Sequence, residues 1–271
     1  MGRLATRRAG TSRGPLAVLL GLVLVLGSSA SANLRAPVVV RESPSAALSA
    51  PDPRLTVERE SLRFTCGSTS CDVTAEYEVV AEAATRVRLD FILPSESPVT
   101  ATANGETAAA TVVPAQPLRP EEARGLPRGE PGAPALFRAG FESALRPGRN
   151  SVAVRYAQPL GAEEVGHGYG KKGRMVQLFR YELWPLREWS RGDGFRIRLA
   201  VSTERPAPGL WQRWFGTSRS LTCISSDPAI PLPPGRKEQK GGELVYEVEL
   251  GPSIPDRVTC YLGDEDLMPR Y

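Results

Sequence analysis

Histidine is nearly absent from this chain of 271 residues, with His167 as the single example. Protein zinc sites usually contain histidines or clustered cysteines, and histidine is the commonest base in enzyme active sites. Any such chemistry would have to run through His167, which lies in the glycine-rich segment 166–173. A loop of this composition is a poor platform for a positioned base. We therefore predict no metal, no cofactor and no histidine-dependent catalysis.

Lysine is also scarce: the chain has 30 arginines but only four lysines, and its formal charge is +4. Four of the arginines lie in the first 32 residues, which hold no acidic residue, so the remainder has 30 basic and 30 acidic residues. A chain with balanced charge lacks the general basic surface that nucleic acids attract. We therefore expect no nucleic-acid partner. The wealth of Arg, Ala, Gly and Pro is typical of GC-rich coding and favours a bacterial source.

Long apolar runs are limited to one, from Leu16 to Leu26. The run follows an arginine-rich start and precedes Ala30-Ser31-Ala32, a small-residue cleavage site. This is the pattern of a secretory signal peptide, and the run is too short to cross a bilayer. We predict a signal peptide over residues 1–32, a secreted or periplasmic location, and no integral membrane segment.

Four cysteines in an exported chain indicate two disulfides, for which three pairings exist. Cys66 and Cys71 flank the turn-forming tetrapeptide Gly67-Ser-Thr-Ser70. A hairpin there would place the two cysteines opposite each other, at a separation that suits a disulfide. We favour Cys66–Cys71 with Cys223–Cys260 over a redox or metal site, because a spacing of four residues is not that of a CxxC motif.

Alternating apolar and polar residues dominate the chain after residue 54. Val73–Val79 and Val87–Leu93 follow the two-residue period of half-buried antiparallel strands, and Asn104-Gly105 is a type I′ hairpin signal. About a dozen short strands and no long amphipathic helix predict an all-β fold, an antiparallel β-sandwich.

Composition divides the chain into segments. Residues 33–53 are rich in Ser, Ala and Pro and predict a flexible linker before a sandwich domain over 54–266. A second division near 158–174 would give two subdomains, which the sequence leaves open. Six prolines make residues 114–135 a long surface loop, either an insertion or a binding loop.

The order of these segments resembles the VIT (vault protein inter-alpha-trypsin) domain, a β-domain of inter-α-trypsin inhibitor heavy chains and of many bacterial envelope proteins. The resemblance covers about residues 55–205. It rests on the strands Val73–Val79, Val87–Pro94 and Val152–Tyr156, and on Phe141–Gly148 before the last of them. It implies a β-sandwich with an interaction role and brings no catalytic residue, and the DxSxS metal motif that usually follows in this family is missing.

The four tryptophans lie within 31 residues of one another, at Trp184, Trp189, Trp211 and Trp214. Exposed aromatic rings stack on sugars or contact proteins, so these residues are candidate binding residues. The alternative is that Trp184 and Trp189 pack in the core beside Tyr181 while the other two cover a sheet edge.

Two further motifs admit simple structural interpretations. Arg191-Gly192-Asp193 matches a cell-adhesion tripeptide, but the Asp-Gly that follows favours an ordinary hairpin turn. Acidic pairs at 121–122 and 163–164 and the cluster 264–266 would suit a glycosidase or a weak calcium site only if the fold paired them in space. We expect them to be solvated surface residues.

The sequence thus predicts a non-catalytic binding or structural protein of the bacterial envelope. Its partner would be a protein or glycan of the cell envelope. The alternative is a carboxylate-dependent enzyme acting on extracellular glycans, which would show two carboxylates facing each other in a deep cleft.

Overall fold

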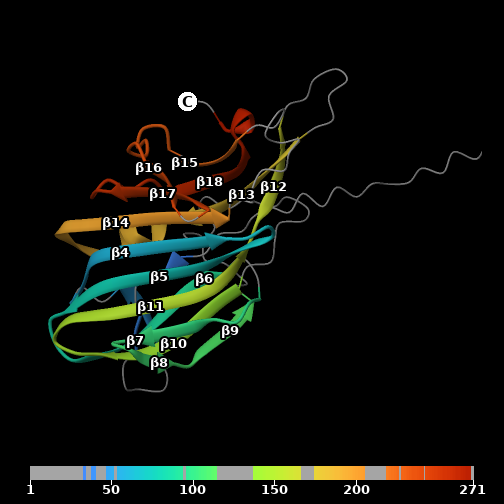
Figure 1. Ribbon diagram of the computed structural model, residues 1–271. Helices are drawn as coiled ribbons and strands as arrows, with labels where there is room; N and C mark the ends of the chain where they lie inside the picture. Colours follow the sequence, from blue (N-terminus) through green and yellow to red (C-terminus); the bar gives the residue numbers. More distant parts are fainter. Residues whose placement is uncertain are drawn as a thin grey trace, which may run out of the picture.

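The computed structural model describes most of the chain as β-strands packed in two layers (Figure 1). It describes residues 33–34, 38–40, 47–51, 54–93, 96–114, 137–165, 174–204, 218–225, 227–240 and 242–269. The predicted signal peptide, His167 with its glycine-rich segment, and the proline-rich stretch after Pro114 lie outside these residues.

The larger layer is an eight-stranded sheet with the order β16-β17-β14-β4-β5-β11-β7-β8. Figure 1 shows β14, β4, β5 and β11 side by side at its centre. The strand bounds are β4 Leu55–Cys66, β5 Ser70–Ala81, β7 Thr100–Ala103, β8 Glu106–Ala108, β11 Gly148–Pro159, β14 Ser190–Glu204, β16 Arg236–Lys240 and β17 Glu243–Leu250.

Two smaller sheets form the other layer. One has the order β3-β2-β6-β10-β9 with β1 also beside β6, and the other has the order β12-β13-β18-β15. The bounds are β1 Asn33–Leu34, β2 Val38–Val40, β3 Ala47–Pro51, β6 Thr85–Leu93, β9 Ala110–Pro114, β10 Phe137–Leu145, β12 Gly161–Val165, β13 Arg174–Glu182, β15 Arg219–Ser225 and β18 Arg257–Asp264. Two short 3-10 helices complete the described elements, η1 Trp184–Glu188 and η2 Glu265–Leu267.

Aromatic contacts show that both smaller sheets cover the same face of the large one. Phe179 of β13 stacks on Phe64 of β4 with ring centroids 4.4 Å apart, and Phe91 of β6 packs against Tyr156 of β11 at 5.3 Å. Phe64 and Tyr156 both lie opposite Val73 of β5, so their side chains share one face of the sheet. The predicted all-β sandwich is therefore confirmed, with one core between its layers.

The strand pairing is antiparallel everywhere in the described residues except between β4 and β14, which run parallel. This pair brings the later part of the chain back into the sheet that β4, β5 and β11 begin. Buried residues from both sides of the predicted division near 158–174 accordingly form one hydrophobic cluster. None of the helices in the part of the chain described here is long and apolar enough to span a membrane.

Both predicted disulfides are present, Cys66–Cys71 and Cys223–Cys260, and no described cysteine is free. Such bonds persist in oxidising compartments, which agrees with a location outside the cytoplasm. The first joins β4 to β5 across a tight turn, in which the Gly67 amide donates to the Ser70 carbonyl at 2.9 Å. The pairing of β4 with β5 ends at Cys66–Cys71, so the four residues between the cysteines form the predicted loop.

The segment predicted as a flexible linker differs from that expectation. Its residues form β1, β2 and β3, and both β1 and β2 pair with β6. Backbone pairing at the edge of a sheet needs no alternating side-chain pattern, because it uses the N–H and C=O groups that every non-proline residue carries. Composition therefore missed these strands, although Val38-Val39-Val40 is a β-branched run.

The tripeptide Arg191-Gly192-Asp193 also differs from the predicted hairpin turn, because it lies inside β14. Pairing with β4 jumps from Arg191–Val57 to Arg196–Arg59, so four residues of β14 face one residue of β4. This bulge turns Phe195 fully into the core, and the Arg191 guanidinium donates to the Pro252 carbonyl at 2.9 Å. The asparagine–glycine turn is confirmed, with φ of 51° at Asn104 and 83° at Gly105.

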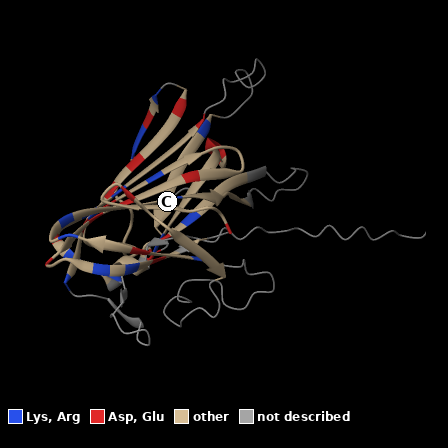
Figure 2. Ribbon diagram, turned by 90° about the horizontal axis from the view of Figure 1, so that it is seen from below, with Lys and Arg blue, Asp and Glu red and all other residues tan. Residues whose placement is uncertain are grey.

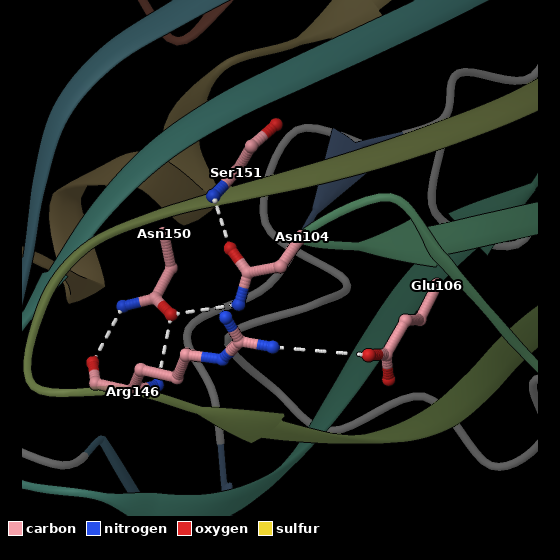
Figure 3. Close-up of polar contacts among 5 residues, drawn as sticks. All are labelled: Asn104, Glu106, Arg146, Asn150 and Ser151. Carbon is pink, nitrogen blue, oxygen red and sulfur yellow. Dashed lines mark hydrogen bonds and ion pairs between the residues drawn. The ribbon is translucent and has the colours of Figure 1, made fainter.

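A buried asparagine ties that turn to the neighbouring hairpin (Figure 3). The Asn150 side chain is 2% exposed, and its Oδ1 accepts hydrogen bonds from the Arg146 amide and the Asn104 Nδ2, both at 2.9 Å. Its Nδ2 donates to the carbonyls of Arg146 and Gly148 at 2.8 Å. The Arg146–Glu106 ion pair beside it is exposed and adds little.

We expect Asn150→Ala to lower the free energy of unfolding by about 2–3 kcal/mol, because it leaves several buried backbone groups without partners. Urea denaturation measures the change. Ser151→Ala is the matched control, since the exposed Ser151 takes part through its backbone amide and carbonyl and should keep wild-type stability. Equal stability of Asn150→Ala and wild type would contradict this assignment.

Candidate binding groove

The strand β15 forms an open edge of the four-stranded sheet, since β18 is its only hydrogen-bonded neighbour among the described strands. The Cα atoms of Cys223 and Cys260 are 4.0 Å apart, which is the spacing of a pair that does not exchange backbone hydrogen bonds. The backbone N–H and C=O of Cys223 therefore point away from β18. By the same alternation those of Leu221 and Ser225 also point to the open side.

A proline-rich segment follows this edge and leads to β16. Residues 227–235 read Asp-Pro-Ala-Ile-Pro-Leu-Pro-Pro-Gly, and prolines favour an extended backbone without pairing to a neighbouring strand. The segment begins with a hydrogen-bonded turn, in which the Asp227 amide donates to the Ser225 Oγ and the Asp227 Oδ1 accepts from the Ala229 amide, both at 2.9 Å. Leu232 packs against the core and anchors the middle of the segment.

A groove of about 800 Å³ lies between this segment, β15 and the start of β16. Its volume falls in the range of ligand-binding sites, about 300–1,000 Å³. It is lined by Thr222, Cys223, Ile224, Ser225, Asp227, Pro228, Pro231, Leu232, Pro233, Pro234, Gly235, Lys237, Tyr246 and Pro269. The first four are consecutive residues of β15. Because side chains alternate between the two faces of a strand, four successive residues line one groove only where it runs along the strand's edge.

Two side chains from the large sheet close the groove at one end. The Lys237 Nζ donates to the Thr222 Oγ1 at 2.9 Å, which links β16 to β15. The ammonium forms no ion pair with any residue that the structure describes. The Tyr246 ring lies against the backbone of Gly235 so closely that an added Cβ would collide with it. A larger residue at 235 would therefore displace the Tyr246 ring from this wall of the groove.

Of the four tryptophans predicted as binding residues, the structure describes the side chain of Trp189 alone. Trp189 is 5% exposed and belongs to the core cluster together with Tyr181 and Leu183, so its ring is not offered to a ligand. This is the alternative that the sequence analysis left open. Trp184 is the first residue of η1, and its side chain lies outside the part of the chain described here. Trp211 and Trp214 lie outside the described residues.

A carboxylic acid lies in the middle of the core, where the sequence analysis did not expect one. Glu60 is 0% exposed and accepts a hydrogen bond from the Tyr181 hydroxyl at 3.2 Å, which in turn lies 3.3 Å from the Tyr77 hydroxyl. A bulge at Glu58 shifts the alternation of β4, so that Glu60 faces inward with Leu62.

Burial governs the ionisation of this cluster. Loss of hydration raises the pKa of Glu60 from its ordinary value of 4.5 to about 7, although hydrogen bonds from Tyr77 and Tyr181 lower it. Burial also raises the pKa of Tyr77, Tyr156 and Tyr181 well above 10. A carboxyl group this deep in the sandwich cannot meet a substrate, so we assign Glu60 to the core and not to an active site.

The predicted acidic clusters form no metal site in the described part of the chain. Among the residues that the structure describes, Asp227 is the single carboxylate lining the groove, and no three His, Cys, Asp or Glu side chains come together as metal ligands would. Of the predicted acidic clusters, Glu121-Glu122 lies outside the described residues. Glu265 accepts a hydrogen bond from Ser218 beside β15.

The outer face of the large sheet is charged but mixed. Figure 2 shows lysine and arginine interspersed with acidic residues along the strands. Arg149 pairs with Glu58 and Glu78 at 3.1 Å, and Arg198 pairs with Glu247 at the same distance. Because opposite charges pair across the strands, the described residues of this face form no patch with a single sign of charge.

The residue patterns of the sequence did not predict this groove, because it is marked by the order of elements along the chain and not by a residue motif. Four prolines between 228 and 234 follow a strand that carries a disulfide cysteine, and prolines have no N–H with which this connection could pair along the strand's edge. Composition alone points instead to the longer proline-rich stretch 114–135, which has six prolines.

Comparison by sequence finds no match: no family model fits the chain, and no curated protein matches it. The resemblance to VIT domains therefore stays a prediction.

Comparison by structure finds a similar fold in a Legionella pneumophila protein provisionally described as nutrient-binding. The two share 10% sequence identity and a TM-score of 0.51, over 86% of this chain and 71% of that one. At this identity the likeness concerns the fold alone.

Two enzymes show weaker likeness. An M1 zinc metallopeptidase from Deinococcus radiodurans gives a TM-score of 0.41 at 12% identity, over 76% of this chain and 42% of its own. The yeast LTA4 hydrolase gives 0.42 at 12% identity, over 82% of this chain and 32% of its own. Since the chain spans less than half of either enzyme, neither likeness bears on activity.

Proposed function

We propose that this protein is a non-catalytic binding module of the bacterial envelope, exported by its predicted signal peptide, and that it holds its ligand in the groove along β15. The groove is the observation that carries the proposal. It has the volume of a ligand site, mostly apolar walls, and a few polar groups that could orient a ligand: Lys237, Thr222 and Asp227. Two disulfides suit such a module to an oxidising compartment.

The same groove favours binding over glycan hydrolysis. A glycosidase needs two carboxyl groups about 5–9.5 Å apart across the scissile bond. Of the described residues, one carboxylate lines the groove, Asp227, and the buried Glu60 is out of reach of any ligand.

A substitution that fills the groove tests the proposal. We expect Ile224→Trp to lower affinity about tenfold or more for any ligand of the groove, because the indole would occupy the space beside β15. Thr65→Trp is the matched control, since Thr65 is exposed on β4 in the large sheet. Binding of the two variants and the wild type to a glycan array and to a random heptapeptide library gives the measurement.

Loss of binding in Ile224→Trp alone supports the groove, provided its melting temperature stays near that of the wild type. If wild type binds neither array, or if both variants keep full binding, the protein is not a binding module acting through this groove.

A further inference from the structure

We propose that the groove takes an extended polypeptide segment, which adds as a further strand to the open edge of β15. This inference rests on the proposed binding function and names its ligand class as peptide and not glycan. Strand addition of this kind obtains affinity from backbone hydrogen bonds and specificity from alternate side chains.

The contrast between the sheet edges carries the inference. The edge strand β16 of the large sheet is a run of five exposed charged or polar residues, Arg236–Lys240. Charges of this kind protect an edge from pairing with another chain. The other end of that sheet is β8, which is only three residues long. Short edge strands are a second form of protection.

The edge strand β15 has neither protection. It is seven residues long, it is uncharged from Ser220 to Ser225, and it contains no proline. Its outward backbone groups at Leu221 and Cys223 have no hydrogen-bond partner among the described residues. An unprotected edge at the side of a groove is a template for a strand supplied by a partner.

The dimensions of the groove fit one strand. Four consecutive residues of β15 line it, which corresponds to a length of about 13 Å at about 3.3 Å per residue. On the side away from β15 the groove is walled by prolines 231, 233 and 234. Prolines carry no N–H and so do not compete for the carbonyl groups of the incoming strand. The disulfide Cys223–Cys260 holds β15 against β18 and keeps the edge in place.

Charge indicates where an acidic group of the peptide would lie. The Lys237 ammonium points at Thr222 and forms no ion pair within the described residues. A carboxylate on the added strand, from a side chain or a chain end, would complete this site. We therefore expect the preferred peptides to combine apolar or β-branched residues with a carboxylate near Lys237.

Backbone methylation tests strand addition directly. Heptapeptides selected from a random library on the full mature chain are synthesised with a single N-methyl group at each position in turn. We expect a loss of affinity of about tenfold or more at alternate positions, where the peptide N–H donates to β15, and little change at the positions between. Side chains are unchanged in this series, so the alternation reports backbone pairing alone.

Two substitutions place the peptide on β15. Ile224→Lys should weaken peptide binding about tenfold, because it gives β15 the kind of charge that protects β16 from pairing. Thr65→Lys is the control, since it adds the same charge at an exposed site away from the groove. Lys237→Met should weaken acidic peptides about threefold and leave neutral ones unchanged.

Three results would overturn the inference: no selected peptide, uniform tolerance of N-methylation, or equal binding by Ile224→Lys and wild type. Groove-dependent binding to the glycan array without peptide binding would overturn strand addition while leaving the binding module in place. Absence of binding to both arrays would overturn both.

Discussion

Replacing Cys223 and Cys260 together by alanine is expected to lower the free energy of unfolding by about 4 kcal/mol. The bridge joins residues 37 apart in sequence, so its removal restores to the unfolded chain the freedom of a long loop. The two strands it joins, β15 and β18, form the side of the sheet that borders the groove. Urea denaturation of the double variant under the same buffer as wild type measures the loss.

The second disulfide provides the matched control. Cys66 and Cys71 are only five residues apart, so their replacement by alanine should cost about 2 kcal/mol. Both bridges lie across antiparallel neighbours and bury both cysteines, so the difference in loop length is the main contrast between them. An equal loss in the two double variants, or a larger loss at Cys66–Cys71, would contradict the chain-entropy explanation.

Stability should also depend on pH through Glu60. Its pKa is 4.5 when unfolded and about 7 when folded, so between these values the folded state holds a proton that the unfolded state has released. Stability is therefore fully present below about pH 4.5 and falls as pH rises toward 7, by up to about 3 kcal/mol in total. The neighbouring tyrosines have pKa values raised well above 10 and do not titrate in this interval.

Glutamine at this position removes the titration while it keeps the shape and a hydrogen-bonding oxygen. We expect Glu60→Gln to be more stable than wild type by less than about 1 kcal/mol at pH 5 and by about 3 kcal/mol at pH 8. Glu76→Gln, on the exposed face of β5, should leave the wild-type pH profile unchanged. Urea denaturation at pH 5 and pH 8 compares the three proteins, and a profile of Glu60→Gln that parallels wild type would refute the assignment.

Alternation and turn chemistry made much of the fold predictable from sequence. The inward residues of β5, from Cys71 to Ala81, follow the two-residue period that the sequence shows. The turn at Asn104-Gly105 requires positive φ at both residues, which asparagine and glycine adopt most readily. The turn tetrapeptide between Cys66 and Cys71 gave the correct disulfide pairing.

Irregular strands account for most of what the sequence concealed. A bulge of one residue at Glu58 reverses which side chains of β4 face the core, and this places Glu60 inside. A larger bulge after Arg191 turns an apparent hairpin signal into a continuous strand. A bulge depends on how a strand pairs with its neighbour, so the pattern of apolar residues along one strand does not reveal it.

The candidate groove was hidden for a related reason. It is formed by a strand edge, a proline-rich connection and Lys237 from another sheet, and only the assembled fold brings these together. The aromatic residues that attracted attention in the sequence instead include Trp189, whose ring lies in the core. Burial of aromatic rings stabilises both cores and binding interfaces, so composition alone does not distinguish the two roles.

Amide hydrogen exchange at β15 tests the central proposal most directly. Exchange of the wild-type protein, residues 33–271, is measured with and without a saturating heptapeptide selected from the library. Strand addition predicts that the amides of Leu221 and Cys223, which point to the open edge, exchange much more slowly in the complex. Unchanged exchange at both amides while the peptide is bound would contradict the assignment of this edge as the binding site.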